Sequence, residues 1–109
     1  MENNVITLTG TVESEPQLSH RVLDENFYIF MLRVPRLSET EDVLPVTVSE
    51  KLYDSETLHP GASVKVSGQL RSYNKYTETK THLILTVFAK AIDVPTEEDE
   101  NDPNEIYIN

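Results

Sequence analysis

Tyrosines and basic side chains interleave in one short segment of the chain. Tyr73 and Tyr76 alternate there with Arg71, Lys75 and Lys80. Aromatic rings stack on unpaired bases, and lysine and arginine neutralise phosphate charge. The segment therefore predicts a surface for single-stranded nucleic acid. The alternative, that it is only the solvated tip of a hairpin, stays open.

Two further arginines are candidates for the same surface. Arg33 and Arg36 leave the most apolar predicted strand on the side that the tyrosine segment would also face. Ile29 and Met31 fall on the outward face of that strand. A second subunit or a loop could cover this apolar pair, or it could contact bases.

The same chain offers little for catalysis. His20, His59 and His82 lie far apart, without the spacing of a metal site. There is no cysteine, no glycine-rich phosphate loop and no nucleophile-elbow pattern. We therefore expect a protein that is not an enzyme and that uses no metal and no cofactor.

The binding residues require strands to position them. In the stretch from Pro60 to Tyr73, Val64, Val66 and Leu70 alternate with polar residues, as in a half-buried strand. Gly68 interrupts this strand, and Gly10 interrupts a similar one. A glycine in a strand indicates a bend, a bulge or a close backbone approach, and such bends suit a small closed barrel.

Five strands and one helix are expected along the chain. Ser49 is a good N-cap, so the segment 49–58 predicts a short helix whose leucines, Leu52 and Leu58, plug the barrel. Residues 13–26 are expected to form a loop. The strands are predicted at 5–12, 27–34, 43–48, 60–73 and 82–94. This is the order of an all-β, five-stranded OB-fold Greek-key barrel with one short helix between strands three and four.

Composition divides the chain into a body and a tail. The 109 residues suffice for one domain, and the formal net charge is −10. Residues 1–94 hold 13 acidic and 9 basic residues, a net charge of −4, and are expected to be the OB domain. Residues 95–109 hold six acidic residues and no basic one, and are expected to be disordered.

Other sequence features bear on location. No apolar run is long enough for a transmembrane helix, and the start of the chain has no secretion signal. The absence of cysteine fits a reducing compartment. A cytoplasmic protein without membrane contacts is therefore expected.

Five segments resemble the OB domain of bacterial single-stranded DNA-binding proteins, over about Asn3 to Val94. They are NVITLTGTV followed by Glu15-Pro16; Phe30, Leu32, Val34 and Arg36 in the pattern F-x-L-x-V-x-R; DVLPVTVSEKL; PGASVKVSGQLRS; and VFAKAI. They occur in the family's order and at its spacing. The chain resembles a divergent or accessory member, because Val43 and Ser49 stand where the family usually carries stacking aromatics.

The resemblance implies a function and partners. Family members bind single-stranded DNA without sequence preference in replication, repair and recombination. They form homo-oligomers, dimers or tetramers, and recruit replication or repair proteins through an acidic tail. The alternative is an OB-fold protein-interaction subunit of a replication or mobile-element assembly with little DNA affinity, which the acidity and the missing aromatics favour.

The end of the tail has two interpretations. Ile106, Tyr107 and Ile108 form an apolar exception in an acidic segment. They could anchor a partner protein, and the tail could also compete with DNA. Otherwise the tail only adds charge and solubility.

Overall fold

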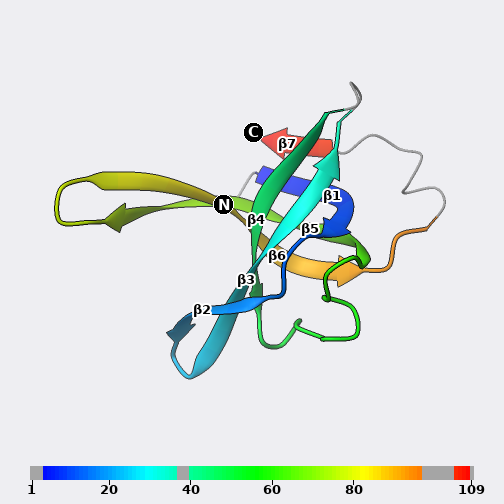
Figure 1. Cartoon of the computed structure of the whole chain (residues 1–109), viewed down its shortest axis with the longest axis horizontal. Helices are drawn as coiled ribbons and strands as arrows, with labels where there is room; N and C mark the ends of the chain where they lie inside the picture. Colours follow the sequence, from blue (N-terminus) through cyan, green and yellow to red (C-terminus); the bar gives the residue numbers. More distant parts are fainter. Residues whose placement is uncertain (1–3, 37–39, 97–104, 109) are drawn as a thin grey trace.

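The computed structural model describes residues 4–36, 40–96 and 105–108 of the chain, and these residues form one seven-stranded sheet (Figure 1). Within them, no helix is long and apolar enough to span a membrane. The strands are β1 Asn4–Val12, β2 Gln17–Val22, β3 Glu25–Pro35, β4 Glu41–Ser49, β5 Ser63–Tyr76, β6 Thr81–Asp93 and β7 Glu105–Ile108.

Five of the strands close into a barrel. β3 pairs with β4, β4 with β6, β6 with β5, and β5 with β1. Thr11 and Val12 of β1 then pair with Arg33 and Leu32 of β3, which closes the circle. β4 and β6 run parallel and all other pairs are antiparallel. This closed, mixed arrangement is that of an OB barrel.

Both mid-strand glycines lie where two strands approach closely. A Cβ atom at Gly10 would stand 2.3 Å from the carbonyl oxygen of Arg33, beside the β1–β3 contact. A Cβ atom at Gly68 would stand 2.1 Å from the carbonyl oxygen of Phe88. The register of β5 and β6 shifts between Ser67 and Gly68, so a bulge lies at the same place. Of the three alternatives that a glycine in a strand leaves open, the structure shows a close backbone approach at both positions and a bulge at Gly68.

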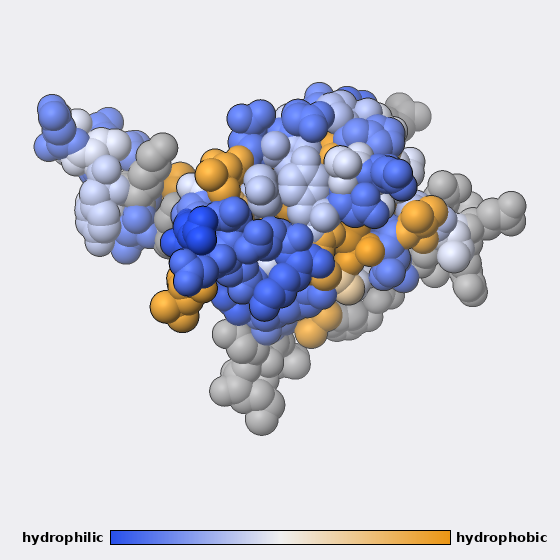
Figure 2. Space-filling model, turned by 90° about the horizontal axis from the view of Figure 1, so that it is seen from below, coloured by the Kyte–Doolittle hydropathy of each residue, from blue (hydrophilic) through white to orange (hydrophobic). Residues whose placement is uncertain are grey.

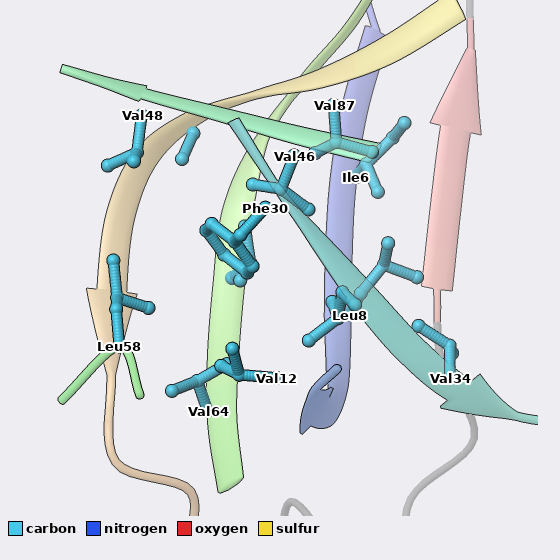
Figure 3. Packing of buried hydrophobic residues seen from close by; sticks show 13 residues of the cluster. Ile6, Leu8, Val12, Phe30, Val34, Val46, Val48, Leu58, Val64 and Val87 are labelled. Carbon is cyan, nitrogen blue, oxygen red and sulfur yellow. The ribbon is translucent and has the colours of Figure 1, made fainter. Parts of the chain in front are cut away.

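The barrel interior is filled by aliphatic side chains around one phenylalanine. Phe30 lies within this cluster, among residues from β1, β3, β4, β5 and β6 (Figure 3). The buried hydrophobic members are Ile6, Leu8, Val12, Phe30, Leu32, Val34, Val46, Val48, Leu58, Val64, Val66, Val87 and Ala89. Most are at alternate positions of their strands, so the opposite positions face outward.

The predicted helix after β4 is wrong. In the described structure, residues 50–57 form separate turns and no helix. The Ser49 hydroxyl accepts a hydrogen bond from the Lys51 N–H at 3.1 Å, and Asp54 Oδ1 accepts one from the Glu56 N–H at 2.9 Å. Each side chain starts a new turn, which competes with a continuous helix. Leu58 is nevertheless 1% exposed and Leu52 packs on the core, so the leucines still plug the barrel.

The predicted number of five strands is also wrong, although the all-β class agrees with the structure. β2 lies in the segment expected to be a loop, and all six of its residues are exposed, so it has no buried face to reveal it. β7 lies in the tail and pairs with β1, so the expectation of disorder does not hold for Glu105–Ile108. The division into a domain of residues 1–94 and a tail of residues 95–109 stays a prediction.

The hairpin of β5 and β6 extends well beyond the barrel (Figure 1). We call residues 72–85 the arm. Its tip is closed by hydrogen bonds between Thr77 and Lys80, with the Thr77 N–H donating to the Lys80 carbonyl at 2.8 Å. Leu83 is 66% exposed on the arm, because no part of the barrel reaches it. The strand predicted to end at Tyr73 therefore continues to Tyr76.

Candidate nucleic-acid interface

Two phenylalanines approach each other on the outside of the barrel. Phe27 lies on β3 and Phe88 on β6, both at outward positions of their strands and both half-buried. Their ring centroids are 5.8 Å apart with the planes tilted by 42°. β4 lies between the two strands, and its Thr47 is in register with Phe88. The pair is thus held by three neighbouring strands of the closed sheet.

β2 adds a third ring to this pair. His20 is opposite Phe27 in the β2–β3 register. Its imidazole stacks on the Phe27 ring with a centroid distance of 4.9 Å and an interplanar angle of 7°. His20 is exposed, so part of its ring meets solvent. A row of flat side chains results, which is the geometry on which bases stack.

Two cations cover the other end of the row. The Arg71 guanidinium carbon lies 4.1 Å from the centroid of the Phe88 ring, and the Lys90 ammonium lies 5.1 Å from it. Both distances are within the range of a cation–π contact. Lys90 is the extra residue of the β5–β6 bulge, since Ser67 pairs with Ala91 and Gly68 with Ala89. Bulges commonly redirect a side chain in this way.

We call His20, Phe27, Phe88, Arg71 and Lys90 the stacking face. Among the described residues, neither Arg71 nor Lys90 forms an ion pair with a carboxylate. Arg71 donates one hydrogen bond, to the side-chain oxygen of Gln69 at 3.1 Å. Two positive charges without a described acidic partner therefore lie beside the aromatic rings, which makes this surface the candidate site for single-stranded nucleic acid.

The opposite end of the stacking face has a carboxylate, Glu25, paired with Lys51. Glu25 accepts a hydrogen bond from the Ser49 hydroxyl, and the Lys51 ammonium lies 3.5 Å from the Glu25 carboxylate. The pKa of Glu25 is lowered, first by the hydrogen bond from Ser49 and, more weakly, by the charge of Lys51. Ser49 is in register with Phe27. The carboxylate of Glu25 thus lies at the Phe27 end of the stacking face, whereas Arg71 and Lys90 lie at the Phe88 end.

The two arginines predicted from the sequence are paired with carboxylates. Arg33 forms an ion pair with Glu13. Arg36 donates from Nε to Asp42 at 2.6 Å and from a second nitrogen to the other carboxylate oxygen. This hydrogen bonding, and then the charge of Arg36, lowers the pKa of Asp42, while the pKa of Arg36 is raised. Each arginine would have to share or leave its partner to bind phosphate.

The residues predicted on the arm lie apart from these arginines. Tyr76 is 75% exposed and Lys80 is exposed beside the tip. Tyr73 and Lys75 lie in β5, opposite Ile84 and His82, and their side chains are outside the described part of the structure. Arg71 lies where the arm leaves the barrel and belongs to the stacking face, so the two candidate surfaces are adjacent at this residue. The binding roles of all these residues stay predictions.

Four residues of the stacking face were not predicted from the sequence: Phe27, Phe88, His20 and Lys90. The alternation that places Phe30, Leu32 and Val34 inside β3 also places Phe27 outside, beside Ile29. It likewise separates Phe88 from the buried Val87 and Ala89. That pattern was sufficient to identify both rings. His20 and Lys90 could not be found this way, because one lies on a fully exposed strand and the other on a bulge.

The closed barrel with its parallel β4–β6 pair defines the chain as an OB-fold protein. The chain is 49% identical to the N-terminal domain of the PriB protein from Thermoanaerobacter tencongensis, which was solved as a dimer. The match covers 88% of this chain and 100% of that domain, with a TM-score of 0.73. The chain therefore belongs to the same family as this PriB domain.

Two more distant structures share the fold. One is the small single-stranded DNA-binding protein from Streptomyces coelicolor, at 19% identity and a TM-score of 0.66, covering 90% of this chain and 99% of that one. The other is the second single-stranded DNA-binding protein, SSBb, from Mycobacterium smegmatis, at 22% identity and a TM-score of 0.64, covering 84% and 88%. No protein-family model and no curated protein matches the sequence.

Proposed function

We propose that the chain binds single-stranded DNA without sequence preference, as a homo-oligomer acting in replication, repair or recombination. The observation that carries this proposal is the stacking face, where the rings of Phe27 and Phe88 adjoin Arg71 and Lys90, two cations that have no carboxylate partner in the described part of the chain. Stacking is tolerant of sequence because every base has a flat face. The neighbours named as single-stranded DNA-binding proteins, and the dimeric PriB domain, support the same function.

The path of the strand follows from the charges. Bases stack across Phe27 and Phe88, and the phosphates pass Arg71 and Lys90 toward the arm, away from Glu25. Tyr73, Lys75, Tyr76 and Lys80 would continue this path, with Arg33 and Arg36 as minor contributors because of their carboxylate partners. This function involves no catalysis, and it would be exercised in the cytoplasm beside the DNA.

A salt series with fluorescent oligo-dT tests this proposal. If two to four phosphates are neutralised, the slope of log K against log salt should be about −1.4 to −2.8. Anisotropy at about 50 mM salt should show saturable binding, because screening is weak there. Binding that is absent at this salt concentration would contradict the proposal.

Two features favour a second candidate function. Arg33 and Arg36 are paired with carboxylates, and the chain has a net charge of −10, so both features weaken attraction to phosphate. A protein-interaction subunit with little DNA affinity would match those features. Its candidate contact is the end of the tail, Ile106, Tyr107 and Ile108, through which replication or repair proteins would bind. Failure of oligo-dT binding, with a stable complex between the chain and a replication protein, would favour this function.

Two matched substitutions compare Arg71, which has no carboxylate partner among residues 4–36, 40–96 and 105–108, with Arg36, which is paired with Asp42. Arg71→Gln should lower affinity about five- to tenfold and make the salt slope less steep by about 0.7, since one phosphate contact is lost. Arg36→Gln should change affinity by less than about twofold, because Asp42 already matches the charge of Arg36. Oligo-dT anisotropy measures both. Equal losses in the two variants would show that the ion pair opens to bind DNA.

A further inference from the structure

His20 lies on an edge strand of the sheet and stacks against the barrel. Among the described strands, β2 pairs with β3 alone, at one end of the strand order (Figure 1). All six residues of β2 are exposed. The imidazole of His20 nevertheless has a fixed position, since it stacks on the Phe27 ring with the two ring planes only 7° apart. One face of the imidazole thus covers Phe27, and part of the ring meets solvent.

The two ring nitrogens of His20 have different surroundings. Nδ1 lies 3.0 Å from the hydroxyl oxygen of Ser19, within hydrogen-bond distance. Among residues 4–36, 40–96 and 105–108, Nε2 has no hydrogen-bond partner. A neutral imidazole has one N–H donor, whereas a protonated imidazole has two. Only the protonated ring can therefore donate to Ser19 and to a ligand at the same time, and it also brings a positive charge.

The charged groups on the elements beside His20 are already paired. On β2 and the turn that follows it, Arg21 forms an ion pair with Asp24 at 3.3 Å. At the start of β3, the Glu25 carboxylate lies 3.5 Å from the Lys51 ammonium. Both cations near this end of the stacking face therefore have a carboxylate partner. A phosphate that reached this end would meet a cation without such a partner only if the imidazole were protonated.

A change of pH acts on this end of the stacking face through histidine. Histidine is the only side chain that ordinarily titrates between about pH 5 and pH 8. The pKa of Glu25 is lowered, first by the hydrogen bond from Ser49, so the Glu25 carboxylate remains charged over this range. A fall in pH thus leaves the carboxylate unchanged and adds positive charge beside Phe27.

We propose that protonated His20 is a phosphate-binding residue, so that the chain holds single-stranded DNA more tightly at about pH 6 than at about pH 8. The inference rests on the DNA binding of the proposed function. The proton comes from solvent, and the bound phosphate stabilises the charged ring, so proton uptake and DNA binding favour each other. The gain in affinity is present at the acidic side of the titration range of histidine and is lost as the pH rises through it. The bound strand then extends by about one phosphate past Phe27 toward β2.

Anisotropy of oligo-dT at two pH values tests this inference on the full chain. The oligonucleotide carries a rhodamine dye, because this dye, thymine and the phosphodiester keep their charge over the range in which histidine titrates. Affinity of the natural chain at about 50 mM salt should be about three- to fivefold higher at about pH 6 than at about pH 8. The slope of log K against log salt should be steeper at the lower pH by up to about 0.7, since one phosphate contact is gained.

Variants of the three histidines identify the group that takes up the proton. His20→Phe keeps a flat ring that cannot be protonated, so its affinities at the two pH values should agree within about 1.5-fold. His59→Gln and His82→Gln are the controls, because His59 lies between β4 and β5 and His82 lies on the arm. Each control should keep the difference of about three- to fivefold. Circular dichroism at both pH values checks that every variant is folded.

Two results would overturn the inference. One is a natural chain that binds with the same affinity at both pH values. The other is a pH response that persists in His20→Phe or that disappears in His82→Gln, since the titrating group would then lie elsewhere. Saturable binding with either result leaves the proposed function in place. Absence of binding at both pH values at about 50 mM salt would instead refute the proposed function, and this inference with it.

Discussion

Gly68→Ala should lower the stability of the barrel by about 3 kcal/mol, the upper part of the range for overpacked sites. The new Cβ atom would lie 2.1 Å from the Phe88 carbonyl oxygen and 3.0 Å from the Ala89 Cα atom. Both are backbone atoms, so β5 and β6 would have to separate. An alanine without this clash would instead stabilise the chain by about 0.4–1 kcal/mol, through the unfolded state. The close approach therefore decides whether the alanine lowers or raises the free energy of unfolding.

Thermal and denaturant unfolding at fixed protein concentration measure this effect. For a domain of this size, a loss of 3 kcal/mol should reduce Tm by roughly 10–20 °C. Ser67→Ala is a control in the same strand and should change stability by less than about 0.5 kcal/mol. Gly61→Ala is a second control, at φ 91° with open space around it, and should cost about 1–2 kcal/mol from conformation alone. A Gly68→Ala variant as stable as the natural chain would contradict the close approach of β5 and β6 at this position.

The glycines show why the barrel could be predicted from the sequence. Period-two alternation marks the buried faces of β1, β3 and β5, and a glycine within such a strand indicates that another backbone comes close. The two strands that escaped prediction lack this alternation. The turn between β2 and β3 is also unusual, since Leu23 and Asp24 have positive φ angles of 49° and 68° where Asn-Gly would be expected. Nothing in the residue types marks this hairpin.

The functional surface was predictable in part, for a related reason. The basic and aromatic residues of the arm are close together in sequence, so their pattern indicates a candidate binding site there. The stacking face is assembled from β2, β3, β5 and β6, and its members are up to 70 residues apart. Its two phenylalanines are half-buried and do not form one large apolar patch. The surface seen from below is mostly hydrophilic, with separate small hydrophobic areas (Figure 2). Only the three-dimensional pairing of β4 with β6 brings Phe27 and Phe88 together.

Phe88→Ala should weaken oligo-dT binding about 30- to 100-fold. One base–ring stack contributes about 1–3 kcal/mol. Phe88 also supports the guanidinium of Arg71, the ammonium of Lys90 and the ring of Phe27. Its removal should therefore cost about 2–3 kcal/mol, near the top of that range. Phe27→Ala, which leaves both cations on their ring, should cost about tenfold. Anisotropy at low salt measures both variants.

Three matched variants distinguish stacking from simple packing. Phe88→Trp keeps a flat ring and should keep the affinity, whereas Phe88→Leu keeps apolar bulk and should lose most of it. Tyr53→Leu removes one ring of the Tyr28–Tyr53 pair, whose ring centroids are 4.7 Å apart. Because neither tyrosine belongs to the stacking face, this variant should leave affinity within about twofold. If Phe88→Ala binds as the natural chain does while remaining folded, the DNA must be held by the arm alone. The tyrosines and lysines of the arm would then carry the whole function, and the rings and cations on the barrel would have no part in holding DNA.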